Sequence, residues 1–179
     1  HGACRPGCAP ACFLPCAAAA SDPDEAFILL ERELGRRLGV WTVDTGSGRV
    51  LAYREHERFA MCSTFKVLAV AAALAHSVDE PGFLGRRIRY AENDMLMFSP
   101  VTERHHADGM RLEQLCAAAL THSDNIAADL ILRQLGGLDG STRYARDIGD
   151  SMFRLARWGL ERHTAYPGDP RDTTTPAAM

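Results

Sequence analysis

Residues 58–74 read RFAMCSTFKVLAVAAAL, and this stretch decides how the chain folds. The part from 64 to 76 is rich in Ala, Val and Leu, which predicts a buried helix. Ser63 and Lys66 stand at its start with the spacing S-x-x-K. Residues three positions apart share one face of a helix, so the Lys66 ammonium group is expected to reach the Ser63 hydroxyl.

This pair of residue types suits nucleophilic catalysis. A serine hydroxyl is a weak nucleophile until a base accepts its proton. An amine in a desolvated pocket has a lowered pKa and can act as that base or as a proton shuttle. The helix N-terminus adds backbone N–H groups near a developing oxyanion. An isolated S-x-x-K is still a weak signal, and a chance match is the commoner explanation.

Strands and helices are both predicted around this segment. An amphipathic helix is expected over 22–38, because apolar residues recur there at helical spacing among charges. Residues 39–59, GVWTVDTGSGRVLAYREHERF, predict two strands joined by a Thr-Gly-Ser-Gly turn. Two more helical stretches are expected within 108–135, and a glycine pair at 136–137 ends the second. From 167 onward the composition is that of a loop. The fold class is α/β or α+β, a sheet backed by helices.

A second motif, Ser123-Asp124-Asn125, follows much later in the chain. A second serine can relay a proton to a leaving nitrogen, and an Asn side chain can hold a substrate amide. Asp124 is expected to fix its loop by accepting bonds from backbone N–H groups. The alternative is a plain helix N-cap before IAADLIL, since all three residue types are favoured there. Capping and catalysis are compatible, and the two motifs together weigh more than either alone.

These motifs, together with SPVTERHHADGM at 99–110 and PGDPRDTTTPAAM at 167–179, resemble the class A serine β-lactamases. The resemblance runs from about Asp24 to Met179. It implies a serine β-lactamase/transpeptidase-like α/β (α+β) fold with a helical domain and the first two strands of an antiparallel sheet. That sheet is expected to be incomplete, because the family's K-T-G strand would lie beyond Met179. A partial β-lactamase domain is therefore expected over 21–179.

The resemblance also implies roles for individual residues. Ser63 would be the nucleophile that opens the β-lactam amide, and Lys66 would be its proton partner. Ser123 would relay a proton to the departing nitrogen, and Asn125 would bind the acylamino side chain of the substrate. Phe98 falls where the family carries an aromatic residue at the pocket mouth. An ordinary core or surface aromatic is the equally weighted alternative for Phe98.

The loop that follows departs from the family pattern. Arg157 and Asp172 match the ion pair that closes the family's Ω-shaped loop. Between them, Gly159 stands where the family has the Glu that activates the hydrolytic water, and His163 replaces an Asn that helps to hold it. Losing a positioned general base typically costs about 10²- to 10⁴-fold in rate. Glu161 and His163 are the candidate substitute bases, so deacylation is in question.

Three functions stay open on these grounds. The leading one is a serine hydrolase that opens the β-lactam amide of penicillin-like antibiotics through an acyl-enzyme on Ser63, and so confers antibiotic resistance. The second is a β-lactam-binding protein that is acylated and cannot deacylate, because Gly159 offers no base. The third is an inactive fragment. A D,D-peptidase shares the S-x-x-K chemistry, but the loop from Arg157 to Asp172 resembles the lactamase pattern. No metal or organic cofactor is needed, and a monomer is expected.

Composition bounds the remaining possibilities. The formal net charge is −3, which gives no basic field for nucleic acid, and no apolar run suggested a membrane span. Residues 1–20 end in FLPCAAAA and are expected to be the remnant of a secretory signal, so the protein is predicted to be secreted.

Four cysteines in this segment either form a soft-metal site or, as the favoured alternative, belong to a presequence. The other two are expected to be buried small hydrophobes, whose pairing stays undecided. The six positions are Cys4, Cys8, Cys12, Cys16, Cys62 and Cys116.

Overall fold

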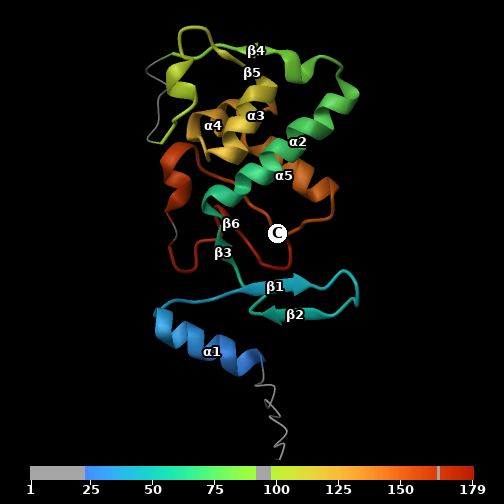
Figure 1. The fold of residues 1–179 in the computed structure, drawn as a ribbon, viewed down its shortest axis with the longest axis vertical. Coiled ribbons are helices and arrows are strands. Elements are labelled where there is room, and N and C mark those ends of the chain that lie inside the picture. Colours follow the sequence, from blue (N-terminus) through green and yellow to red (C-terminus); the bar gives the residue numbers. More distant parts are fainter. Residues whose placement is uncertain (1–22, 92–97, 165) are drawn as a thin grey trace, which may run out of the picture. The chain divides into compact units, whose positions relative to one another are not determined.

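The computed structural model describes residues 23–91, 98–164 and 166–179 (Figure 1). The expected signal remnant at 1–20 and its four cysteines lie outside the described residues. The chain divides into two compact units, of which one extends to Leu38 and the other runs from Gly39 to Met179. Each unit is described by itself.

The first unit contains one helix, α1, over Pro23–Leu34. The predicted amphipathic helix is thus confirmed, although it ends earlier than expected. Gly35 follows it with φ +62°, a left-handed conformation that commonly ends helices. The Leu38 N–H then donates to Glu31 Oε1 at 2.7 Å. No residue of α1 is buried, so its apolar side chains are largely exposed.

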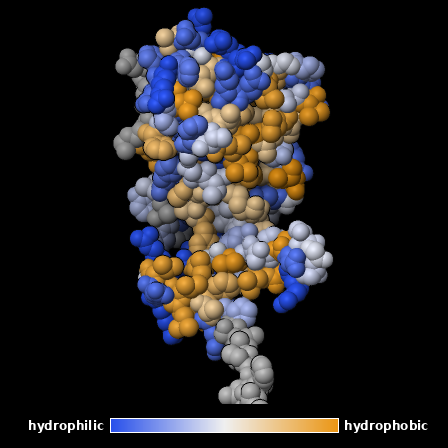
Figure 2. All heavy atoms as spheres, viewed as in Figure 1, coloured by the Kyte–Doolittle hydropathy of each residue, from blue (hydrophilic) through white to orange (hydrophobic). Residues whose placement is uncertain are grey.

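The second unit begins with the predicted hairpin. Strands β1 (Val40–Val43) and β2 (Val50–Tyr53) pair antiparallel, with Val40 opposite Tyr53 and Val43 opposite Val50. The turn is held by Asp44, which accepts hydrogen bonds from Gly46 N at 2.9 Å and from Ser47 Oγ at 2.5 Å. Apolar residues are exposed over this hairpin (Figure 2), and they include Trp41, Val43, Val50 and Leu51.

Four helices form the core of the second unit. The central helix is α2 (Phe65–Asp79), and it packs against α3 (Leu112–Thr121), α4 (Asn125–Gln134) and α5 (Leu138–Asp147). Figure 1 shows α2 crossing this group of helices. The helix predicted over 64–76 and the two stretches within 108–135 are confirmed, whereas α5 was not predicted. The largest fully buried apolar side chains of this core are Phe65, Phe83, Phe153, Leu112, Leu115, Ile131 and Leu132.

The segment Cys62–Asp79 corrects one expectation about membranes. It is long and apolar enough to cross a bilayer by length and composition alone, although no such segment was expected. Its buried side chains, among them Phe65, Ala69 and Ala73, lie in the apolar core of this same unit. A helix packed in this way has the properties of a core helix.

Short strand pairs tie the loops to this core. Strand β3 (Phe59–Ala60) pairs antiparallel with β6 (Thr173–Thr174), and β4 (Arg87–Ile88) pairs with β5 (Met110–Arg111). The expectation of loop from 167 onward is therefore wrong at Thr173–Thr174, which form strand β6. The β3–β6 pair brings the end of the long loop beside the start of α2. Short 3₁₀ turns complete the unit, namely η1 (Cys62–Thr64), η2 (Phe83–Gly85), η4 (Thr102–Arg104) and η5 (Gly159–His163).

The two cysteines among the described residues, Cys62 and Cys116, are both free thiols. Cys116 is buried in α3, as expected, and burial raises its pKa to about 11. Cys62 is exposed, so the prediction of a buried residue was wrong there. The reason is that Cys62 lies in the turn η1, before the buried face of α2 begins.

Candidate active site

Ser63 lies in the turn η1, two residues before Phe65, the first residue of α2. The preceding Cys62 has φ +46°, a left-handed conformation that costs a non-glycine residue about 1–3 kcal/mol. Surrounding bonds hold this turn in place. Met61 N donates to Asp172 O at 3.0 Å, and Thr64 Oγ1 donates to Met61 O at 2.8 Å. The half-buried Ser63 is thus presented on a constrained backbone.

Lys66 is the centre of the polar contacts at this point. Its side chain is 2% exposed, and its Nζ lies 3.4 Å from Ser63 Oγ. The same Nζ donates to Ser123 Oγ at 2.9 Å, to Ser123 O at 2.5 Å and to Asn125 Oδ1 at 2.9 Å. The structure therefore brings together the two serines and the asparagine that the motifs singled out, and it does so around one amine.

The environment of Lys66 weakens its hold on a proton. Burial lowers the pKa of Lys66 to about 8, and the nearby Arg162 adds to this effect. Asp124 and Asp129 act in the opposite direction. At mildly alkaline pH the neutral amine is well populated, and a neutral amine within reach of two hydroxyls can move a proton between them.

Asp124 fixes the loop that carries Ser123. It is the N-cap of α4, and its Oδ1 accepts from Ala127 N at 2.9 Å. Its Oδ2 accepts from Val101 N at 3.0 Å and from Thr102 N at 2.9 Å. The fully buried carboxylate therefore holds two separate segments together. Ser123 itself has φ +54°, and this strained backbone allows both its carbonyl and its hydroxyl to face Lys66.

The segment that contains Phe98 is bonded to the same motif. Asn125 N donates to Phe98 O at 3.2 Å, and Ile126 N donates to Ser99 Oγ at 3.4 Å. Phe98 has φ +60°, and its side chain is 67% exposed. Phe98 is therefore not a core residue, and its place at a pocket mouth stays a prediction.

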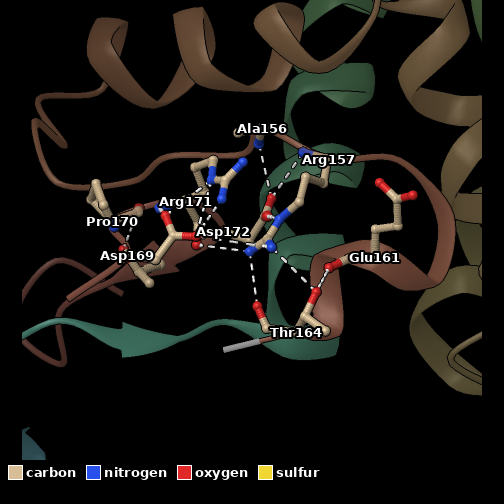
Figure 3. Close-up of polar contacts among 9 residues, drawn as sticks. Ala156, Arg157, Glu161, Thr164, Asp169, Pro170, Arg171 and Asp172 are labelled. Carbon is tan, nitrogen blue, oxygen red and sulfur yellow. Dashed lines mark hydrogen bonds and ion pairs between the residues drawn. The ribbon is translucent and has the colours of Figure 1, made fainter. Parts of the chain in front are cut away.

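The structure also brings Arg157 and Asp172 together (Figure 3). Arg157 Nε lies 2.5 Å from Asp172 Oδ2, and both side chains are largely buried. Asp172 Oδ1 accepts from Ala156 N at 2.8 Å and from Arg157 N at 3.2 Å. Arg157 Nη2 donates to Thr164 O at 2.8 Å. These bonds close the loop 157–172 onto itself.

The two candidate substitute bases differ in placement. Glu161 is exposed, and Figure 3 shows its carboxylate pointing away from the Arg157–Asp172 pair. Within the described residues its carboxylate makes no hydrogen bond to Ser63 or Lys66. His163 has a buried Nε2 without a hydrogen-bond partner among the described residues, and burial lowers its pKa. Gly159 begins η5 with φ +56°, a conformation that suits glycine.

Arg162 is a residue of this site that no motif predicted. It is 3% exposed and forms an ion pair with Asp129 of α4. Its guanidinium carbon lies 4.4 Å from the centre of the Phe65 ring, at the start of α2. No local pattern signals it, because a single arginine within a loop matches no motif of catalytic or binding residues. A compositional feature of the same site was also overlooked, namely that Lys66 is the only lysine in the sequence.

Together these contacts define a serine site served by a buried amine. Within the described residues, no group of three His, Cys, Asp or Glu side chains lies close enough to hold a metal ion. The Ser63 hydroxyl, the weakly basic Lys66 and the second hydroxyl of Ser123 are the groups needed for serine acyl transfer.

Comparison with known proteins gives the family. Residues 25–179 match the model of the Beta-lactamase enzyme family. The chain belongs to the class A β-lactamases.

Individual relatives agree with this assignment. The chain is 47% identical over 155 residues to the carbapenem-hydrolyzing β-lactamase KPC of Klebsiella oxytoca, covering 87% of this chain and 53% of the relative. It is 48% identical over 156 residues to β-lactamase AST-1 of Nocardia asteroides, covering 87% and 50%. The crystal structure of a β-lactamase from Desulfarculus baarsii superposes with a TM-score of 0.84 at 51% identity, covering 86% of this chain and 57% of that one. The chain thus spans about half the length of the curated relatives it matches.

Proposed function

We propose that this protein opens the amide bond of penicillin-like β-lactams by acylating Ser63. The observation that carries the proposal is the position of Lys66 Nζ, within hydrogen-bonding distance of both Ser63 Oγ and Ser123 Oγ. The family assignment supplies the class of substrate.

The proposed acylation uses the contacts of Lys66 in sequence. The neutral amine accepts the proton of Ser63 Oγ as the oxygen attacks the lactam carbonyl. The carbon–nitrogen bond of the lactam then breaks, and the nitrogen receives a proton from Ser123 Oγ. Lys66 returns its proton to Ser123 across the 2.9 Å contact, so the amine and hydroxyl are restored. The product is an ester between Ser63 and the opened lactam.

Hydrolysis of that ester would complete a β-lactamase cycle, and it needs an activated water. A second candidate function, a β-lactam-binding protein that stays acylated, is favoured by the loop 157–172. Gly159 carries no side chain, and Glu161 points away from the loop's ion pair. The buried side chain that this loop adds beside α2 is the cation Arg162 rather than a carboxylate. A cation cannot accept the proton of the hydrolytic water.

Intact-mass spectrometry over time after addition of penicillin tests both functions. The expected result is a one-to-one adduct that is lost in Ser63→Ala. Ser77→Ala provides the control, because Ser77 lies on the same helix with its hydroxyl bonded to Leu74 O. A short-lived adduct with release of opened penicillin identifies a hydrolase, and a lasting adduct identifies the binding protein. If wild-type protein with an intact thermal transition forms no adduct, the proposed acylation is wrong.

A further inference from the structure

A second buried cation lies near Lys66. Arg162 is 3% exposed, and its Nη2 donates to Asp129 Oδ1. The bonds that close the loop 157–172 are made by Arg157 and do not use Arg162. Buried ion pairs contribute little net stability, because removing both ions from water is costly. The position of this pair beside the reactive residues therefore points to a role other than holding the loop.

The two cations share one aromatic ring. The guanidinium carbon of Arg162 lies 4.4 Å from the centre of the Phe65 ring, and Lys66 Nζ lies 6.0 Å from the same centre. Both distances are within the range of cation–π contact. Phe65 is fully buried, so the charges interact through a medium that screens them weakly.

Charged and titratable groups face Lys66 from two elements. Helix α4 contributes Asp129 and its N-cap Asp124, whose negative charges favour the ammonium form. The turn η5 contributes Arg162, which opposes it, and His163, whose pKa is lowered by burial, by Arg162 and by Lys66 itself. A guanidinium group does not lose its proton in proteins, whereas an ammonium group does. Repulsion between the two cations is therefore relieved at Lys66.

We propose that Arg162, held in place by Asp129, is a positioning residue that keeps the Lys66 amine ready to accept the Ser63 proton. The inference rests on the proposed acylation of Ser63 and adds a source of base strength particular to this chain. Asp129 balances part of the Arg162 charge, so the ion pair sets how strongly Lys66 is affected. Burial remains the first cause of the lowered Lys66 pKa, and Arg162 is the second.

The titration of Lys66 can be followed directly by NMR spectroscopy in this chain. Because Lys66 is the only lysine, protein labelled with [6-¹³C]lysine has one labelled side-chain resonance, and its pH midpoint reports Lys66 alone. Arg162→Gln is expected to raise the midpoint, and Asp129→Asn to lower it, each by about one pH unit. A merely structural role of the pair would not produce shifts of opposite sign.

Matched controls separate this effect from a general change of charge. Arg86 and Glu80 form an exposed ion pair on the surface, so Arg86→Gln and Glu80→Gln are expected to leave the midpoint unchanged. If a single variant at the buried pair does not fold, the double variant Arg162→Gln/Asp129→Asn removes both charges together. Its midpoint is expected above that of wild type, because Arg162 outweighs Asp129 at Lys66. Midpoints that stay at the wild-type value, or that move in the same direction in both single variants, overturn the inference.

The pH dependence of adduct formation with penicillin provides the second readout. Its midpoint is expected to move in parallel with the resonance of Lys66 in each variant. If wild type forms no adduct, the proposed function fails, while the resonance midpoints still decide the role of Arg162. If the adduct forms and the resonance midpoints do not move, only the inference on Arg162 fails.

Discussion

The Lys66 cluster and the loop 157–172 lie next to each other and differ in the reactive side chains that they carry. In the cluster, one buried amine contacts Ser63, Ser123 and Asn125, so the groups for acylation are in place. The loop is closed just as firmly by Arg157 and Asp172. Between these residues the loop carries Gly159, the exposed Glu161 and the buried Arg162, whereas the family resemblance implies a water-activating carboxylate at position 159. The comparison teaches that the contacts which close a loop and the side chains available for chemistry within it are separate features of the sequence.

Removing the amine is expected to have the largest effect. Lys66→Met keeps the length and apolar stem of the side chain and removes the proton acceptor. The rate of adduct formation should fall by about 10²- to 10⁴-fold, which is the usual contribution of a positioned base. Rapid-quench mass spectrometry with penicillin measures this rate. An unchanged rate would show that Lys66 is not the base for acylation of Ser63.

A carboxylate at position 159 tests whether the loop lacks only a general base for hydrolysis of the adduct. Gly159→Glu is expected to shorten the lifetime of the adduct by about 10²-fold, the lower end of the contribution of a general base. Gly159→Gln is the matched control, because it has the same shape and the same strain at φ +56° without a base. Equal lifetimes in the two variants would mean that something other than the missing carboxylate limits hydrolysis.

Loop closure is expected to matter for stability. Asp172→Ala removes the carboxylate that pairs with Arg157 Nε and accepts from two backbone N–H groups, and should lower the free energy of unfolding by about 3 kcal/mol. Glu80→Ala removes the partner of the exposed Arg86, far from this loop, and should have a much smaller effect. Denaturant titration followed by circular dichroism measures both. Equal losses would contradict the view that the Arg157–Asp172 pair closes the loop.

The last prediction, which needs no substitution, is the pH dependence of acylation in wild type. Because burial lowers the pKa of Lys66 to about 8, the neutral amine increases as pH rises toward that value. The rate of adduct formation should rise about tenfold per pH unit below this pKa and level off above it. A rate that falls as pH rises from 6 to 8 would mean that the protonated form of Lys66 is the active one.

Local patterns predicted the fold where they were strong. The hairpin and the helix α2 carried clear signals in alternation, turn residues and composition. Helix α5 was missed because its sequence, LDGSTRYARD, has few apolar residues and contains Gly and Ser, which favour other conformations. The pair β3–β6 was missed because strands of two residues have no periodicity to detect.

In the candidate site, too, local contacts could be predicted from the sequence and long-range contacts could not. The sequence alone predicts that Ser63 and Lys66 lie close together, because residues three apart in a helical segment are neighbours whatever the rest of the chain does. The contact of Lys66 with Ser123, 57 positions away, and that of Arg162 with Asp129, 33 positions away, arise only in the folded unit. Such contacts depend on how α4 and η5 pack against α2. Packing is cooperative over the whole unit, and for this reason no local sequence pattern predicts these long-range contacts.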